Sequence, residues 1–154
     1  MVITILALMV SVAVFNAPPP RSSAKDEAER FAARLIAASE DAVLQGSVMS
    51  VEMTPFGYRI LRYANGEWRA DENAGRFSDR AFAPGVAVTL TLEDAALANK
   101  PPKERRDADA PQRIILDPVG VAPAFSALFA DDRERWIVRG NENQTVEVIN
   151  DGRR

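Results

Sequence analysis

The sequence predicts an α+β protein in which N-terminal helices precede, and pack on, an antiparallel β-sheet body of two sheets. Three observations support this fold class. Residues 1–15 are almost wholly apolar, residues 24–45 carry apolar side chains every three or four positions, and the apolar period falls to two after Gly46. A chain of 154 residues can bury one hydrophobic core. We therefore expect a single folded domain preceded by a separate apolar segment.

Composition excludes several classes of enzyme. The chain contains no His and no Cys, so it has no disulfide, no thiol nucleophile and no imidazole for acid–base catalysis or zinc binding. A carboxylate pair remains possible in principle, but Asp71, Glu72, Asp94, Asp131 and Asp132 all fall in turn-like segments that favour acids for local hydrogen bonding. We expect no enzymatic activity, no catalytic residue and no cofactor.

Two short segments carry successive oxygen ligands that could in principle hold calcium. They are residues 71–73 and 141–143, and each combines Glu with Asp or Asn. Neither segment has the ligand spacing of a calcium-binding loop. The sequence therefore predicts no metal site.

Residues 1–17 are the most hydrophobic part of the chain and predict a membrane or assembly helix. A bilayer span needs about 20 apolar residues, so we expect the start of this helix to lie upstream of Met1; an ordinary core helix is the alternative. Residues 18–23 contain three successive prolines and predict a break. The side chains expected to serve membrane insertion and packing between subunits are Ile3, Ile5, Leu6, Leu8, Val10 and Val12.

The soluble domain is expected at residues 24–152 and begins with an amphipathic helix over residues 24–45. Ser23 and Asp26 have the spacing of a capping box, and Gly46 is a typical helix stop. Ile36 and Val43 are expected to widen the buried stripe, whereas Asp41 is assigned to another face. The residues predicted to pack the helix on the sheet are Phe31, Leu35, Ala38 and Ala42.

Alternating strands are expected to fill the rest of the domain. Asn65-Gly66 predicts a two-residue hairpin turn, and residues 70–84 and 94–111 are expected to be loops. The predicted strands cover residues 47–53, 58–64, 67–69, 86–92, 113–117, 124–130, 135–139 and 145–149.

A basic loop is the one candidate for anion binding. Its cations are Lys100, Lys103, Arg105 and Arg106, which could form a weak phosphate-binding patch, although a solvated loop is the simpler interpretation. No aromatic side chain is interleaved with these charges, as a single-strand binder would require. The formal charge of the whole chain is −3, which argues against a dedicated nucleic-acid binder.

Five segments of the chain follow one another in a specific order. They are AERFAARLIAASEDAVLQGSVMSVEM, GYRILRYANGEW, FAPGVAVTLTL, RIILDPVGVAPAFSALF and WIVRGNENQTVEVI. This order resembles that of type IV pilin-like proteins, and in particular the minor pseudopilin H family of the type II secretion system (the GspH/FimT group). The resemblance implies a pilin-like fold and a structural, non-enzymatic subunit near the tip of the pseudopilus that aids protein export across the outer membrane.

The resemblance also implies a location and a set of partners. A bacterial inner-membrane anchor with one pass would hold the soluble domain in the periplasm, where it would contact the major and the other minor pseudopilins. The family's basic leader, Gly-Phe cleavage site and early Glu are not found in this sequence, so the prepilin peptidase is a partner only if a leader precedes Met1. A minor pilin of a type IV pilus or DNA-uptake system, and a membrane-tethered periplasmic binding module, remain the alternatives.

Overall fold

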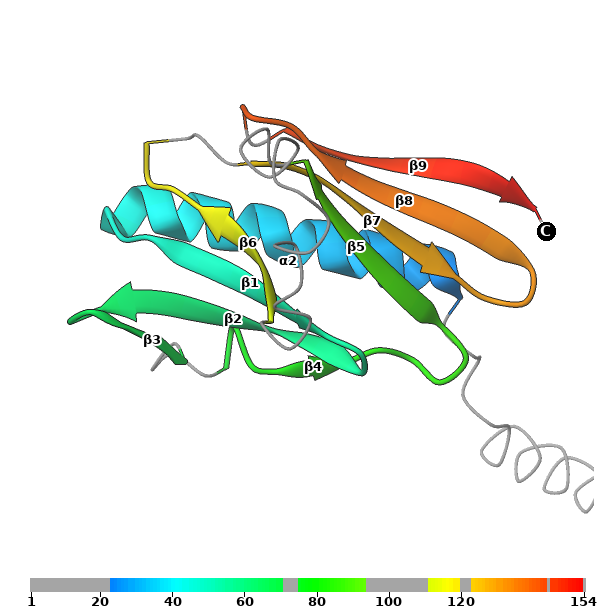
Figure 1. Cartoon of the computed structure of the whole chain (residues 1–154), viewed down its shortest axis with the longest axis horizontal. Coiled ribbons are helices and arrows are strands. Elements are labelled where there is room, and N and C mark those ends of the chain that lie inside the picture. The colour runs from blue at the N-terminus through cyan, green and yellow to red at the C-terminus, as the bar shows by residue number, and fades with distance from the viewer. Residues whose placement is uncertain (1–22, 71–74, 94–110, 120–122, 144, 154) are drawn as a thin grey trace, which may run out of the picture.

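One long helix packs on two antiparallel sheets in the computed structural model (Figure 1). The structure describes residues 23–70, 75–93, 111–119, 123–143 and 145–153. The predicted membrane helix (residues 1–17) and the Pro-rich break up to residue 22 lie outside these residues. Within the described part of the chain, no helix combines the length and the apolar composition that a membrane span requires. The α+β fold with two sheets agrees with the prediction from the sequence.

Helix α2 (Ala24–Gln45) begins and ends at the predicted signals. The Ser23 hydroxyl accepts a hydrogen bond from the Asp26 amide, and the Asp26 carboxylate accepts one from the Ser23 amide, which confirms the capping box. Gly46 adopts the left-handed conformation with φ of 59°, and its amide donates to carbonyls of the last turn. The helix is therefore fixed at both ends by local sequence.

The first sheet, sheet A, has the strand order β3-β2-β1-β6. Its members are β1 (Met49–Thr54), β2 (Gly57–Ala64), β3 (Glu67–Ala70) and β6 (Gln112–Leu116), with the short β4 (Arg80–Ala81) pairing beside β2. Asn65 and Gly66 both have positive φ, 54° and 84°, which confirms the predicted hairpin turn between β2 and β3. Residues 70–84 are predicted to be a loop, but they contain strand β4. The sequence could not predict this strand, because two residues are too few to show an alternation of apolar and polar side chains.

The second sheet, sheet B, has the strand order β5-β7-β8-β9. Its members are β5 (Ala87–Glu93), β7 (Ala124–Ala130), β8 (Glu134–Gly140) and β9 (Val146–Arg153). Strand β9 runs four residues beyond the predicted end at residue 149, although Asn150-Asp151-Gly152 is typical of a turn. A register shift opposite Arg135 and Trp136 accommodates these residues as a bulge within the pairing.

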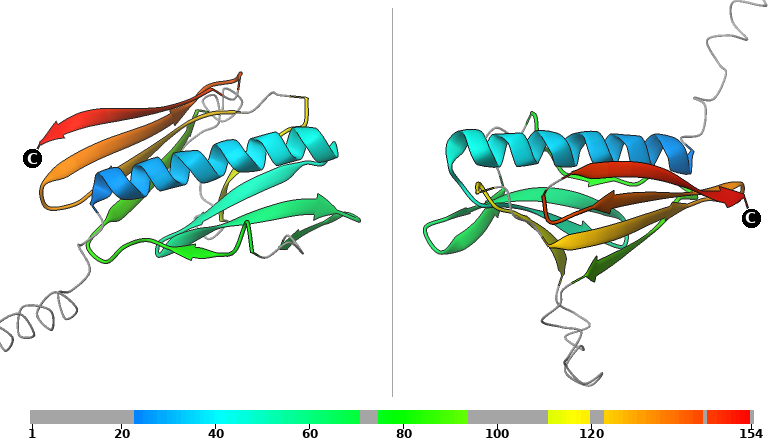
Figure 2. Two further views of the ribbon diagram at one scale, coloured as in Figure 1. Left: turned by 180° about the vertical axis from the view of Figure 1, so that it is seen from behind. Right: turned by 90° about the horizontal axis from the view of Figure 1, so that it is seen from above.

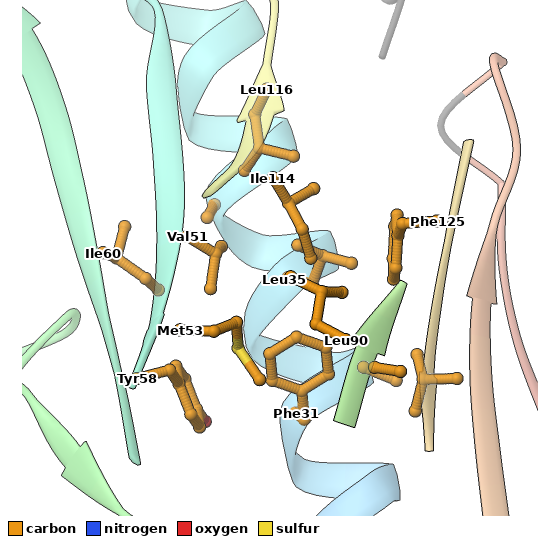
Figure 3. Packing of buried hydrophobic residues seen from close by; sticks show 14 of the residues in the cluster. Phe31, Leu35, Val51, Met53, Tyr58, Ile60, Leu90, Ile114, Leu116 and Phe125 are labelled. Carbon is orange, nitrogen blue, oxygen red and sulfur yellow. The ribbon is translucent and has the colours of Figure 1, made fainter. Parts of the chain in front are cut away.

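The hydrophobic core lies where α2 crosses both sheets (Figure 2). Phe31 contacts Tyr58 of sheet A edge-on, with ring centroids 5.1 Å apart, and Phe129 of sheet B at 5.4 Å. Figure 3 shows Phe31 and Leu35 among side chains from both sheets, including Val51 and Leu90. One face of one helix therefore holds the two sheets together.

The predicted packing face of α2 requires two corrections. Phe31, Leu35, Ala38 and Ala42 are all buried, but Ile36 and Val43 are 42% and 51% exposed. These two side chains therefore lie at the edge of the buried stripe and not within it. Asp41, assigned to an outer face by the sequence, is instead buried, because Arg62 of β2 pairs with it at 2.9 Å. Its charge is compensated from sheet A.

Candidate interaction surfaces

Two partly exposed surfaces and one anchoring turn stand out among the described residues. No group of three or more His, Cys, Asp or Glu side chains that could hold a metal ion occurs among the described residues. The Asn141 side chain accepts hydrogen bonds from the amides of Asn143 and Thr145, so it shapes the β8–β9 turn. Residues 71–73, the other calcium candidate, lie outside the described residues.

The outer face of α2 is the first candidate surface. We define it as Ile36, Ser39, Glu40, Val43 and Leu44. Leu44 is 83% exposed, and the last four of these residues line a shallow depression. The spacing of three and four residues puts all five on one stripe of the helix, which runs beside the buried stripe. A second apolar stripe on an exposed helix is typical of a surface that another helix or subunit covers.

The second candidate surface lies on the side of sheet A that faces away from α2. Glu52 points to this side from β1, because Met49, Val51 and Met53 alternate with it toward the core. Strands β2 and β6 flank β1, and their register places Arg59 and Arg113 opposite Glu52. Arg59 Nε donates to Glu52 Oε1 at 2.6 Å, and Arg113 Nε donates to Oε2 at 2.7 Å.

The two arginines set the electrostatics of this surface. Burial beneath them raises the pKa of Glu52, but the hydrogen bonds and charges of Arg113 and Arg59 outweigh that effect and hold the pKa below its ordinary value of 4.5. The Glu52 side chain is only 1% exposed, whereas those of Arg59 and Arg113 are 48% and 31% exposed. The carboxylate therefore stays ionised under its two partners, and the cluster presents a net positive charge to solvent.

An aromatic pair adjoins these charges. Tyr63 of β2 pairs with Trp68 of β3, and their rings lie 5.1 Å apart. The guanidinium of Arg113 lies 5.7 Å from the centre of the Trp68 ring. Because β3 and β6 are separated by β2 and β1, this contact spans the outer side of the sheet. We call Glu52, Arg59, Tyr63, Trp68 and Arg113 the arginine–tryptophan face.

The start of α2 is anchored to sheet B. Asp131, in the β7–β8 turn, accepts a hydrogen bond from the Ala24 amide at 2.9 Å and others from the amides of Arg133 and Glu134. The Ala24 amide is the main cause of a pKa for Asp131 below its ordinary value of 3.8. Lys25 lies 5.5 Å from the centre of the Trp136 ring. The β7–β8 turn thus contacts the first residues of α2, where the folded domain begins.

The sequence did not identify the arginine–tryptophan face. The alternation of β1 could have placed Glu52 on the side of the strand opposite Met53, but the pairing with Arg59 and Arg113 depends on strand register. The predicted anion patch of Lys100, Lys103, Arg105 and Arg106 lies outside the described residues, as do the membrane-helix residues Ile3, Ile5, Leu6, Leu8, Val10 and Val12.

Comparison with known proteins identifies the fold. No protein-family model matches the chain, and no curated protein matches its sequence. Among solved structures, the minor pseudopilin EpsH from the type 2 secretion system of Vibrio cholerae matches with a TM-score of 0.65 and 22% identity, covering 85% of this chain and 99% of that one. A crystal structure of the same Vibrio cholerae pseudopilin matches with a TM-score of 0.64 and 22% identity, covering 84% and 94%. The chain therefore has the α+β fold of these minor pseudopilins.

Proposed function

We propose that the chain is a minor pseudopilin, a structural subunit near the tip of a type II secretion pseudopilus that aids protein export across the outer membrane. The observation that carries the proposal is the structural agreement with EpsH, which has a TM-score of 0.65 and covers 85% of this chain and 99% of that one. The two alternatives raised by the sequence are a type IV minor pilin and a periplasmic binding module, and no feature among the described residues favours either of them.

The outer face of α2 supports a role in assembly. A subunit of a filament must bury surface against its neighbours, and Ile36, Val43 and Leu44 offer apolar area on a helix that is already rigid and capped. We propose that helices of neighbouring pseudopilins cover this face. The major and the other minor pseudopilins are then the partners.

The anchor at the start of α2 supports the mechanical part of the proposal. A pseudopilin would be held in the inner membrane by the segment before Ser23, with its soluble domain in the periplasm. Force along that segment would reach the domain at Ala24, where Asp131 joins the helix to sheet B. The domain would then move as one body, and pushing a substrate requires no catalytic group.

An export assay tests this function. Deletion of the gene in the host bacterium should abolish appearance of type II substrates in the medium, and the full chain supplied in trans should restore it. The substrates should accumulate in the periplasm, since the step affected is passage through the outer membrane. Unchanged export in the deletion strain would contradict the proposal.

A further inference from the structure

The arginine–tryptophan face has hydrogen-bonding capacity beyond what the fold uses. Each guanidinium directs Nε and one terminal nitrogen to its own oxygen of Glu52, so the carboxylate is fully engaged from both sides. An arginine carries more N–H donors than this arrangement consumes, and both side chains remain partly exposed. With two cations and one anion, the cluster keeps a formal charge of about +1 that the described residues do not neutralise.

The aromatic side chains make the same area suitable for close contact. The Trp68 ring lies close to the Arg113 guanidinium, and the ring of Tyr63, which is 46% exposed, packs on Trp68. Leu61 and Ser50 on the same side are buried. Trp, Tyr and Arg are the residue types that contribute most to protein interfaces, and here their side chains are already held in position by one another.

We propose that the arginine–tryptophan face docks an acidic segment of a neighbouring protein subunit, with an Asp or Glu side chain received between Arg59 and Arg113. This inference rests on the proposed function, because it names the kind of partner that the subunit takes at a surface other than α2. The partner carboxylate would accept the remaining guanidinium donors, while the side chains beside it would pack on Trp68 and Tyr63.

The small positive charge of this face and its limited extent favour a protein partner over a nucleic acid. A nucleic-acid site requires an extended basic surface, whereas this face carries about one net positive charge on a chain with a formal charge of −3. A single carboxylate complements that charge. Arginine also suits this role because its planar group can bind Glu52 and a second carboxylate at the same time.

The test uses single-cysteine variants of the full chain in cells that assemble the secretion system. The native chain has no cysteine, so Ala70→Cys places one reactive thiol beside the face, where Ala70 is exposed and pairs with Leu61. Thr91→Cys, exposed on the outer side of sheet B, is the matched control. A photoactivatable maleimide probe on each thiol is irradiated, and mass spectrometry identifies the cross-linked peptides.

Three charge states of the face make the test specific. The native face carries about +1, Glu52→Gln raises it to about +2, and the triple variant Glu52→Gln, Arg59→Gln, Arg113→Gln reduces it to about 0 without leaving an uncompensated buried charge. Circular dichroism and urea unfolding of each variant show whether the fold is kept. Gln matches Glu in size at position 52, whereas at positions 59 and 113 it is shorter than Arg and has fewer N–H donors.

We expect the Ala70→Cys probe to form an adduct with an Asp- or Glu-containing peptide of another pseudopilus subunit. The yield should fall by about tenfold in the folded triple variant, the effect of losing one or two charge-assisted hydrogen bonds, and should be unchanged or higher in Glu52→Gln. Lack of such an adduct, an adduct with a peptide without acidic residues, or equal yields at all three charges would overturn the inference.

The inference and the proposed function fail in different ways. If gene deletion abolishes export but the Ala70→Cys probe yields no acidic subunit peptide, only the docking inference is wrong. If deletion leaves export unchanged, the proposed function is wrong, whatever the probe contacts. An adduct with a nucleic acid or a lipid in place of a protein would also overturn the docking inference.

Discussion

The two sides of helix α2 differ in what covers them, although both carry apolar residues. The inner side contains Phe31 and Leu35, which lie between the two sheets and are almost fully buried. The outer side contains Ile36, Val43 and Leu44, which are 42%, 51% and 83% exposed. A helix that needed only to complete its own domain would carry polar residues there. The difference indicates that the inner side stabilises the fold, whereas the outer side is available to neighbours.

Truncation of the inner side should have the largest effect on stability. Phe31→Ala should lower the free energy of unfolding by about 3–5 kcal/mol, because it removes a ring that touches both sheets and leaves a cavity. Ile36→Ala, on the outer side of the helix, should lower the free energy of unfolding by less than about 1 kcal/mol. Urea unfolding followed by circular dichroism measures both values. Equal losses would mean that the outer side also supports the fold.

Glu52 points away from the core and is nevertheless buried. It therefore tests whether a side chain outside the core also stabilises the fold. Glu52→Ala should cost about 2 kcal/mol at pH 7, allowing for the exposure of Arg59, because two arginines would then face each other without a carboxylate. Thr91→Ala on the exposed side of sheet B is the control and should be nearly neutral. A neutral result for Glu52→Ala would show that the cluster adds nothing to the fold.

The same carboxylate predicts a dependence on pH. The pKa of Glu52 is lower in the folded protein than its ordinary value of 4.5, so the unfolded chain binds the proton more readily. The stabilisation is therefore complete above pH 4.5 and is lost as the pH falls through the lower pKa of the folded state. Urea midpoints measured from pH 7 to pH 3 should fall more steeply for the native chain than for Glu52→Gln. Parallel curves would contradict this prediction.

Asp131 should have a smaller effect, confined to the start of α2. Asp131→Ala removes the acceptor of the Ala24 amide and should cost about 1 kcal/mol. Its neighbour Asp132, whose side chain is 88% exposed, is the matched control, and Asp132→Ala should be within about 0.5 kcal/mol of the native chain. Hydrogen exchange should show faster opening of the first turn of α2 in Asp131→Ala. Equal exchange rates in the two variants would mean that Asp131 does not stabilise the first turn of α2.

Local signals in the sequence predicted much of the fold. Ser23, Asp26 and Gly46 determine the two ends of α2 through contacts within a few residues, and Asn65-Gly66 determines its hairpin in the same way. The extent of β9 could not be predicted, because its turn-like Asn150-Asp151-Gly152 is held in a strand by pairing with β8. Local propensity is overridden where a neighbouring strand supplies the hydrogen bonds.

The surfaces were harder to predict than the elements that bear them. The spacing of Ile36 and Val43 is compatible both with a widened packing stripe and with an exposed one. Only their exposure in the folded domain shows that they lie outside the packing stripe. The partners of Glu52 are 7 and 61 positions away along the chain, so their approach depends on the β1–β2 and β1–β6 registers. A pattern along one strand predicts a face but not what its neighbours bring to it.

The smallest effect on stability should accompany the largest effect on assembly. Val43→Ser combined with Leu44→Ser changes two exposed side chains and should leave the urea midpoint nearly unchanged. If neighbouring subunits cover the outer side of α2, however, the folded variant should assemble poorly, because the apolar area it offers to them is lost. The fold and the assembly would then depend on different faces of one helix.

Incorporation into the filament tests the central claim most directly. Pseudopili sheared from the cells and probed with an antibody against this chain should contain the native protein together with the major pseudopilin. The Val43→Ser, Leu44→Ser variant should be present in the cells at normal abundance but depleted from the sheared fraction by about tenfold, the effect of losing two apolar contacts. Absence of the native chain from the filament, or equal incorporation of the variant, would contradict the account.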